Sequence, residues 1–485
     1  MRNQLTIIGK IMGIFISSFS FTYLIPVLIS LIYRDHQARY FLITFAITLI
    51  LGLSLYLPFR KAKARLKTRD GFIIVTLFWT VLSIISALPL HLSSALQVPL
   101  THAIFEATSG FTTTGATVLV GLDHLPKSIL WYRTQLHFFG GMGIIILAVA
   151  IMPLLGMGGM ALFKAEASGM VKEDKITPRI AQTARSLWAV YLILLILCAL
   201  TYLIGGMDLF DAVTHAFTTI ATAGFSNYDA SLGHFNSKFI ESSAILFMFL
   251  GSINFTVHIL AFRKQNIRYY LNNTELRTFF TICVSAIGII GITLYHHGVF
   301  HSFWEALHQA AFAVMAMITT TGLSISAFSE WPTFIPLLII FLSFIGGCAG
   351  STAGGIKVIR IILLTKQALR EIKLLIHPHA KLPIKINNRL IPHNVLGSVW
   401  AFLGLYAFST GVLTLIVTGF GLSPLDAFSA VAACLNITGP GLGEVANNYQ
   451  SLSNGTLSTL IFTMLLGRLE IFTIFVLLMP SFWRN

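Results

Sequence analysis

The sequence predicts an all-α polytopic membrane protein in which four parallel repeats surround one pore, preceded by two N-terminal spans. Each repeat is a span, a pore helix, a filter segment and a second span. Two observations predict this fold. Of the 485 residues, 55% are hydrophobic and only 10% are charged, whereas soluble proteins carry about 25% charged residues. In addition, one short glycine motif occurs four times along the chain.

The recurring motif is a glycine preceded by small or hydroxyl-bearing residues, with an alanine twelve positions before each glycine. Glycine permits positive φ and a close approach of bare backbone to a ligand. Four such segments around one axis predict a ring of carbonyl oxygens, the construction of a cation filter. The predicted filter residues are Thr112, Thr113, Thr114, Gly115, Ala221, Thr222, Ala223, Gly224, Thr319, Thr320, Thr321, Gly322, Asn436, Ile437, Thr438 and Gly439.

Ten apolar stretches reach the roughly 20 residues that a spanning helix needs. They are residues 5–33, 41–59, 72–92, 135–153, 187–204, 239–262, 278–295, 334–364, 395–420 and 457–480. The first two stretches flank no glycine segment, and the other eight pair off around the four segments. The sequence therefore predicts an N-terminal two-span module (1–70) and four pore repeats (71–185, 186–277, 278–392 and 393–485).

Basic residues predict the orientation of these spans. Most of the 32 Lys and Arg residues lie in four connections, at 60–69, 164–185, 263–277 and 360–389. The positive-inside rule places these connections and both termini in the cytoplasm. The net charge of +14 then reflects orientation, and we expect no nucleic-acid partner. Because every repeat enters and leaves on the same side, the repeats are parallel, unlike the inverted repeats of many transporters.

The four units, together with Gly-Phe-Thr-Thr-Thr-Gly at 110–115, resemble the superfamily of Trk, Ktr and HKT potassium transporters over essentially the whole chain. The resemblance implies K⁺ as the transported ion, no covalent cofactor and a bacterial inner-membrane location. It also implies a homodimer among membrane lipids and a cytoplasmic TrkA-like regulatory ring that binds NAD(H) or ATP/ADP. Relatives that favour sodium have serine where this chain has Gly115. The implied K⁺ contacts are Thr113, Thr114, Thr222, Ala223, Thr320, Thr321, Ile437 and Thr438.

A second glycine-rich stretch, residues 346–355, interrupts the eighth predicted span. Its five glycines each disfavour a helix by about 1 kcal/mol relative to alanine. Close helix packing would explain two glycines but not five, and the Gly-Lys-Ser/Thr of a phosphate loop is missing. We expect a mobile loop in the pore below the filter, and the family resemblance also implies a gate here. The predicted gate residues are Gly346, Gly347, Gly350, Gly354, Gly355, Arg468 and Glu470.

Arg468 lies about midway along the last predicted span. Charged residues there are costly and usually face an interior cavity. We expect Arg468 to face the pore and to donate to carbonyls of the glycine stretch, with Glu470 orienting the same region. An ion pair between the two is the alternative, but residues two apart on a helix point to different faces.

Three acidic residues, Glu106, Asp211 and Asp426, lie at or near the starts of the short helices. There a carboxylate favourably meets the positive end of the helix dipole, so we expect a structural role for each.

Two other functions are weighed. A potassium symporter coupled to protons or sodium would need ionisable residues at mid-membrane, where we find only Arg468 and Glu470. A membrane enzyme would need a nucleophile–base or metal constellation. His301 and His308 near Glu305 come nearest, and they lack that arrangement. The sequence therefore does not predict an enzyme.

Overall fold

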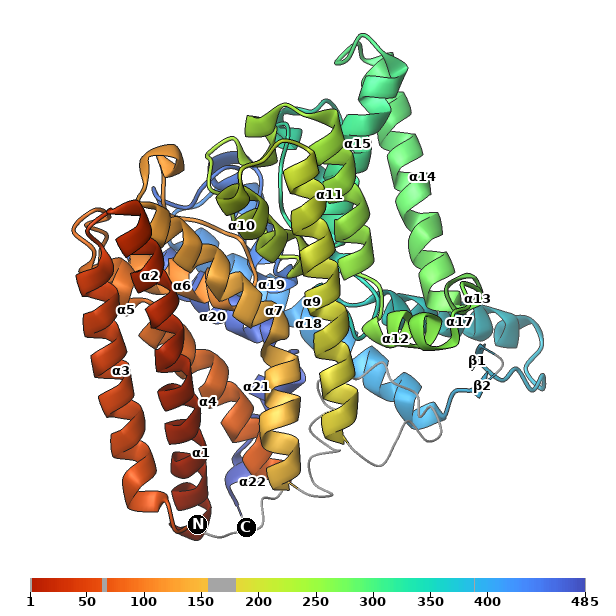
Figure 1. The fold of residues 1–485 in the computed structure, drawn as a ribbon. Helices are drawn as coiled ribbons and strands as arrows, with labels where there is room; N and C mark the ends of the chain where they lie inside the picture. Colours follow the sequence, from red (N-terminus) through yellow and green to blue (C-terminus); the bar gives the residue numbers. More distant parts are fainter. Residues whose placement is uncertain (1, 63–67, 156–179, 388, 485) are drawn as a thin grey trace.

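The computed structural model describes residues 2–62, 68–155, 180–387 and 389–484. Helices make up most of this part, as predicted (Figure 1). The strands in the described part form one short antiparallel hairpin, β1 (Lys385–Ile386) and β2 (Arg389–Leu390). The basic residues predicted at 63–67 and 164–179 lie outside the described residues.

The N-terminal module consists of α1 (Arg2–Ser20), the 3₁₀ turn η1 (Phe21–Tyr23), α2 (Leu24–Tyr33) and α3 (Ala38–Phe59). Two glycines let α1 and α3 pack closely. A Cβ added to Gly13 would lie less than 3.0 Å from the backbone of Tyr56, and one on Gly52 would overlap Ser17. Small residues at such crossings are the usual means by which membrane helices bring their backbones together.

The remaining helices form four groups, one around each glycine segment, and we keep the name repeat for each group. The first repeat comprises α4 (Thr68–Ser86), α5 (Leu88–Leu92), α6 (Leu100–Phe111) and α7 (Lys127–Leu155). The second comprises α9 (Ile180–Ile204), α10 (Leu209–Ile220), α11 (Lys238–Gly251) and α12 (Phe255–Lys264), and α13 (Arg268–Leu271) follows it. The third comprises α14 (Thr274–His296), α15 (Phe303–Ile318), α16 (Ile335–Ile345) and α17 (Val358–Ile376). The fourth comprises α18 (His393–Gly419), α19 (Pro424–Asn436), α20 (Asn454–Arg468), α21 (Phe472–Leu478) and α22 (Pro480–Trp483).

A 3₁₀ turn follows the glycine segment in every repeat, a feature that the glycine motif by itself does not predict. These turns are η2 (Leu122–His124), η4 (Ser231–Phe235), η5 (Phe328–Glu330) and η6 (Gly443–Val445).

Within the described residues, six helices are long and apolar enough to cross a membrane, or eight if each strongly bent pair counts as one span. The sequence predicts ten. Of the other two, residues 135–153 lie in the continuous helix α7, whose side chains beyond residue 143 are outside the described part. Residues 334–364 form two helices, α16 and α17, because the glycine-rich stretch interrupts them as predicted.

The second spans of three repeats are broken at the glycine-rich stretch or at a sharp bend. α11 and α12 meet at 93°, and α20 and α21 meet at 110°. Arg468 is the last residue of α20, and Glu470 in the bend has a left-handed backbone with φ 47°. Arg468 thus lies about midway along the last predicted span, as expected, but at a break in that span, since α20 ends there.

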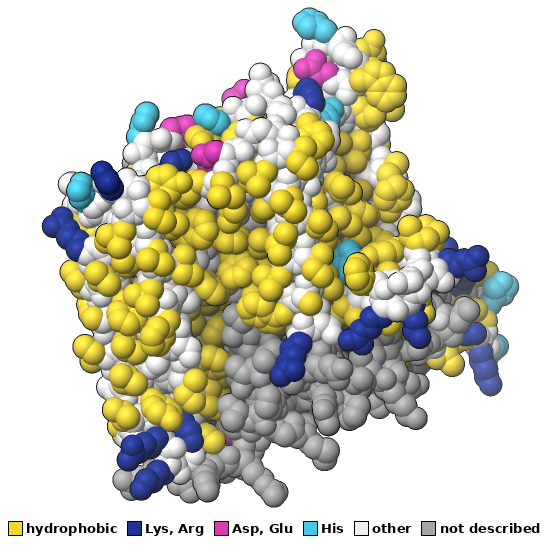
Figure 2. Space-filling model, in the orientation of Figure 1, with side chains coloured by type: hydrophobic (Ala, Val, Ile, Leu, Met, Phe, Trp, Pro, Cys, Tyr) yellow, Lys and Arg dark blue, Asp and Glu magenta, His cyan; other side chains and the backbone are white. Residues whose placement is uncertain are grey.

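Side-chain type divides the surface into zones (Figure 2). A broad hydrophobic band covers the middle of this face. Acidic and histidine side chains gather at its upper end, and most of the coloured Lys and Arg side chains lie at its lower end. Such a band is what a lipid-facing surface requires, because every exposed polar group in hydrocarbon is costly.

We expect Gly52→Leu to destabilise the protein by roughly 1–3 kcal/mol, because the new side chain would overpack the crossing of α1 and α3. Gly404→Leu is the matched control, since a Cβ at Gly404 meets nothing within 4 Å. The free energy of unfolding in detergent is measured for both variants. Equal stability of the two variants would show that the crossing tolerates a large residue.

Candidate functional site

The four predicted segments each begin where a short helix ends, after α6, α10, α15 and α19. We call these segments (residues 112–115, 221–224, 319–322 and 436–439) the glycine ring. Their non-glycine residues are all buried, with at most 2% of any side chain exposed. The hydroxyl and small side chains of these segments are therefore buried inside the protein, away from its outer surface.

The ring glycines meet one another's segments in a closed cycle. A Cβ added to any of them would lie less than 3.0 Å from the carbonyl oxygen that precedes the next ring glycine, closer than real Cβ atoms approach. The pairs are Gly115 with Ala223, Gly224 with Thr321, Gly322 with Thr438, and Gly439 with Thr114. Because the fourth contact returns to the first segment, the ring is closed, and a backbone carbonyl lies at each joint.

The residue two positions before each ring glycine has a left-handed backbone. Their φ values are 60° for Thr113, 50° for Thr222, 56° for Thr320 and 61° for Ile437. All four are β-branched, a class in which positive φ is a genuine outlier. Backbone strain of this kind concentrates at ligand-binding sites, where the surrounding structure must hold it. The sequence carries a matching signal, a β-branched residue at the same offset four times, beside the glycines from which the filter was predicted.

Hydroxyl groups fix the segments to their helices. In the first repeat Thr112 donates to the carbonyl of Thr108 (2.7 Å) and pairs with Thr114 (2.8 Å). The third repeat has the same pattern, because Thr319 bonds the carbonyl of Met315 (2.6 Å) and the hydroxyl of Thr321 (2.7 Å). These side chains are thus satisfied by protein, which leaves the backbone carbonyls as the groups that can face an ion.

A buried ion pair clamps the first and second segments beyond their glycines. Arg133 donates from Nε to Glu106 (2.8 Å) and from Nη1 to the carbonyl of Ser226 (3.0 Å). Glu106 in turn accepts the backbone N–H of Val118 (2.9 Å). Both charged side chains are 1% exposed. Glu106 is the seventh residue of α6, so its predicted place near the helix start is wrong, although its role is structural.

The other two acidic residues do lie in the first turns of their helices, α10 and α19. Asp211 accepts from the side chains of Asn227 (2.8 Å) and Tyr228 (2.6 Å), which follow the second segment. Burial, and then this carboxylate, raise the pKa of Tyr228, so its hydroxyl remains a donor. The backbone N–H of Asp426 is capped by Ser423 (3.2 Å).

The glycine loop (residues 346–355) lies against one side of the ring. Thr352 donates to the carbonyl of Ile220 (3.0 Å) and accepts from Thr222 (3.2 Å). The N–H of Gly354 donates to Thr320 (2.7 Å), and a Cβ on Gly354 would overlap the carbonyl oxygen of Asn436. The loop therefore touches the second and third ring segments and approaches the fourth.

Arg468 reaches the first segment. Its guanidinium donates to the carbonyl of Gly140 (2.5 Å) and to the hydroxyl of Thr113 (3.3 Å), and it lies over the ring of Trp79 (4.7 Å). Glu470 forms an ion pair with Arg360 (2.6 Å). The predicted bonds from Arg468 to the glycine loop stay a prediction. Neither Gly140 nor Trp79 was identified from sequence, because nothing in their spacing marks them.

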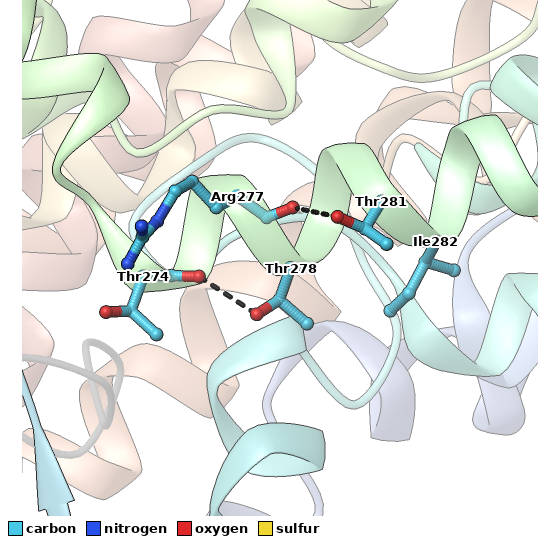
Figure 3. A pocket seen from close by; sticks show the side chains of 5 residues that line it. All are labelled: Thr274, Arg277, Thr278, Thr281 and Ile282. Carbon is cyan, nitrogen blue, oxygen red and sulfur yellow. Dashed lines mark hydrogen bonds between the residues drawn. The ribbon is translucent and has the colours of Figure 1, made fainter.

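A separate hollow of about 360 Å³ lies beside the first turns of α14 (Figure 3). The hydroxyls of Thr278 and Thr281 donate to carbonyls of their own helix, those of Thr274 and Arg277. Because α14 alone lines this hollow, it lacks the convergent groups of an ion site. Within the described residues, no three His, Cys, Asp or Glu side chains are grouped to hold a metal.

Comparison with known proteins finds similar proteins over nearly the whole chain. The family model described as TrkH, cation transport protein, matches residues 37–484. The chain is 47% identical to the Trk system potassium uptake protein TrkH of Vibrio parahaemolyticus over 484 residues, covering 99% of this chain and 100% of that one. It is 46% identical to the TrkH of Escherichia coli K12, with 99% of each covered. The crystal structure of the Vibrio parahaemolyticus potassium transporter TrkH superposes with a TM-score of 0.91 at 46% identity, covering 99% of this chain and 100% of that one.

We expect Arg133→Leu to destabilise the protein by about 3–5 kcal/mol, because it leaves the Glu106 carboxylate buried without its cation. Lys238→Leu serves as the control, since Lys238 pairs with Glu241 but is 62% exposed and such pairs contribute at most about 1 kcal/mol. The free energy of unfolding in detergent is compared between the two variants and the parent. An Arg133→Leu protein as stable as the control would rule out the clamp.

Proposed function

The chain belongs to the TrkH family of cation transport proteins, and on this premise we propose that it carries potassium across the bacterial inner membrane through the glycine ring. The observation that carries the proposal is the closed cycle of glycine–carbonyl contacts. The resemblance of the chain to Trk, Ktr and HKT proteins, which its motifs indicated, is confirmed, and the family is one of transporters and not of enzymes.

The chemistry suits a dehydrated monovalent cation. Rings of backbone carbonyls replace the hydration shell of K⁺ in ion filters. The four short helices end at the ring, so their partial negative ends add to the attraction. The fourth segment has Ile437 where the other three have threonine. An isoleucine side chain cannot bind an ion, but its backbone carbonyl can, so the proposed K⁺ contacts are backbone contacts. The proposed K⁺ ligands are the carbonyls of Thr113, Thr114, Thr222, Ala223, Thr320, Thr321, Ile437 and Thr438.

The gate in this proposal has two parts, the glycine loop and Arg468. In support, the loop bonds Thr222 and Thr320 of the second and third segments and approaches the fourth, while Arg468 bonds Thr113 of the first. Together they obstruct the same side of the ring. Because only a few hydrogen bonds join the loop to the ring, the loop can move away while the carbonyls that select the ion stay in place.

Orientation and partners complete the proposal. Most of the Lys and Arg side chains coloured in Figure 2 lie at the lower end, and we assign that end and both termini to the cytoplasm. Proteins named for a Trk system work with other components, and we propose a homodimer whose cytoplasmic face binds a TrkA-like ring regulated by NAD(H) or ATP/ADP.

Flux of K⁺ and Na⁺ into liposomes, driven by the gradient of one ion alone, tests the proposed function. The parent chain should pass K⁺ without any proton or sodium gradient, which a symporter would require. Gly115→Ser should lower the K⁺/Na⁺ permeability ratio, because its Cβ would collide with the Ala223 carbonyl and displace it. Unchanged selectivity in a folded variant would remove Gly115 from the filter.

Arg468→Ala should conduct faster than the parent, and Arg468→Lys should be intermediate. At ~10 Å and an effective dielectric near 20, a guanidinium and a K⁺ repel by roughly 1.7 kcal/mol, so removing the charge can raise flux about tenfold. The alanine variant also frees Thr113, whereas lysine keeps the charge but loses the planar fork. Flux in the same liposomes measures this. A folded alanine variant that conducts no faster would show that Arg468 is not a barrier.

A further inference from the structure

One buried carboxylate holds the glycine loop at Ala349, apart from Thr352 and Gly354, the loop residues that bond at the ring. Glu275, in the first turn of α14, is 8% exposed. Its Oε1 accepts the backbone N–H of Ala349 in the loop (2.8 Å) and that of Ile359 at the start of α17 (3.2 Å). A single oxygen thus ties together the loop, the helix that follows the loop, and α14.

The loop makes backbone bonds on the same side. Cys348 donates to the carbonyl of Ser252 (2.9 Å), and Phe255 donates to the carbonyl of Gly350 (3.1 Å). These bonds fix the loop to the bend between α11 and α12. Each of these bonds joins one backbone pair, whereas the single Oε1 atom of Glu275 accepts two backbone N–H groups at once. Because Ile359 lies in the first turn of α17, Glu275 joins the glycine loop to α14 and to α17 through one side chain.

The attachment continues to the surface. Thr274, the neighbour of Glu275, donates from its hydroxyl and its backbone N–H to Oδ1 of Asn387 (2.6 and 3.2 Å). Asn387 follows β1, is exposed, and has a left-handed backbone with φ 45°. The β1–β2 hairpin, which the proposed orientation places in the cytoplasm, is therefore linked to the loop through Thr274 and Glu275.

We propose that Glu275 is a positioning residue of the gate: it anchors the closed glycine loop to the cytoplasmic face, and the hairpin at Asn387 acts on the loop through Thr274 and Glu275. The inference rests on the proposed gate role of the loop. A force that moves the hairpin or the start of α14 would draw the Glu275 carboxylate from Ala349 and Ile359 together. The loop would then keep its backbone bonds to the bend between α11 and α12, the bond from Lys357 to the carbonyl of Ala353, and its contacts with the ring.

Cys348 provides a reporter that does not depend on flux. It lies next to Ala349 and is 1% exposed, so a maleimide reaches it only when the loop opens. The other cysteines, Cys198, Cys283 and Cys434, are buried and are replaced by alanine in the full-length chain in liposomes. Labelling rate and K⁺ flux are then measured on the same preparations of parent and variants.

Glu275→Ala should raise the labelling rate of Cys348 about tenfold or more, and flux with it. Glu275→Gln should recover part of the protection, because its amide oxygen can still accept both N–H groups. Asn387→Ala, an exposed change that does not threaten folding, should raise labelling about threefold. Glu371→Ala is the matched control, since Glu371 is a 56% exposed glutamate on α17, and it should behave as the parent.

The outcomes test separately whether Glu275 anchors the loop and whether the loop is a gate. Parental labelling in both Glu275 variants, or no recovery by glutamine, overturns the anchor. Parental labelling in Asn387→Ala overturns the link to the hairpin. Faster labelling with parental K⁺ flux supports the anchor and overturns the gate role proposed for the loop.

Discussion

The contact between each ring glycine and the carbonyl of the next segment is the constraint on which the rest of the structure depends. It leaves no room for a Cβ at any of the four glycines. It also requires a left-handed backbone at four β-branched residues, Thr113 and its equivalents. Such strain costs on the order of 1–3 kcal/mol per residue and persists only where the surroundings impose it. The carbonyls at the four ring contacts therefore keep their positions only because the surrounding residues hold the strained backbone.

The surroundings that impose this strain differ from repeat to repeat. In the first and third repeats, threonine hydroxyls pair within the segment and bond its helix. Beyond the first and second segments, the buried pair of Arg133 and Glu106 joins two neighbours. In the fourth repeat, Tyr449 donates to the carbonyl of Gly439 (2.8 Å). Equivalent backbones are thus supported by different side chains.

The sequence predicted the helical fold, the order of elements and the interruption at 346–355, because composition, spacing and glycine content act locally. It did not predict what depends on tertiary contact. Arg468 was placed within a continuous helix, since nothing in residues 465–470 marks a 110° bend. The partner of Glu106 is Arg133, 27 residues away, and Gly140 accepts from a residue of the last repeat. No periodicity encodes such pairings, and no local pattern joins Glu275 to Ala349.

The four ring segments are alike in backbone, but the groups that contact them from the glycine loop and from Arg468 are not. The difference has a physical reason. The second spans of the other three repeats are broken, whereas α7 of the first is continuous. A continuous helix has no free loop to offer, and α7 instead approaches the ring through Gly140, where a Cβ would overlap the carbonyl of Phe111. Arg468 occupies this corner from the last repeat, bonding Gly140 and Thr113. The ring thus has four equivalent corners, whereas its contacts with the loop and with Arg468 differ from corner to corner, and under the proposed function the first would serve selection and the second gating.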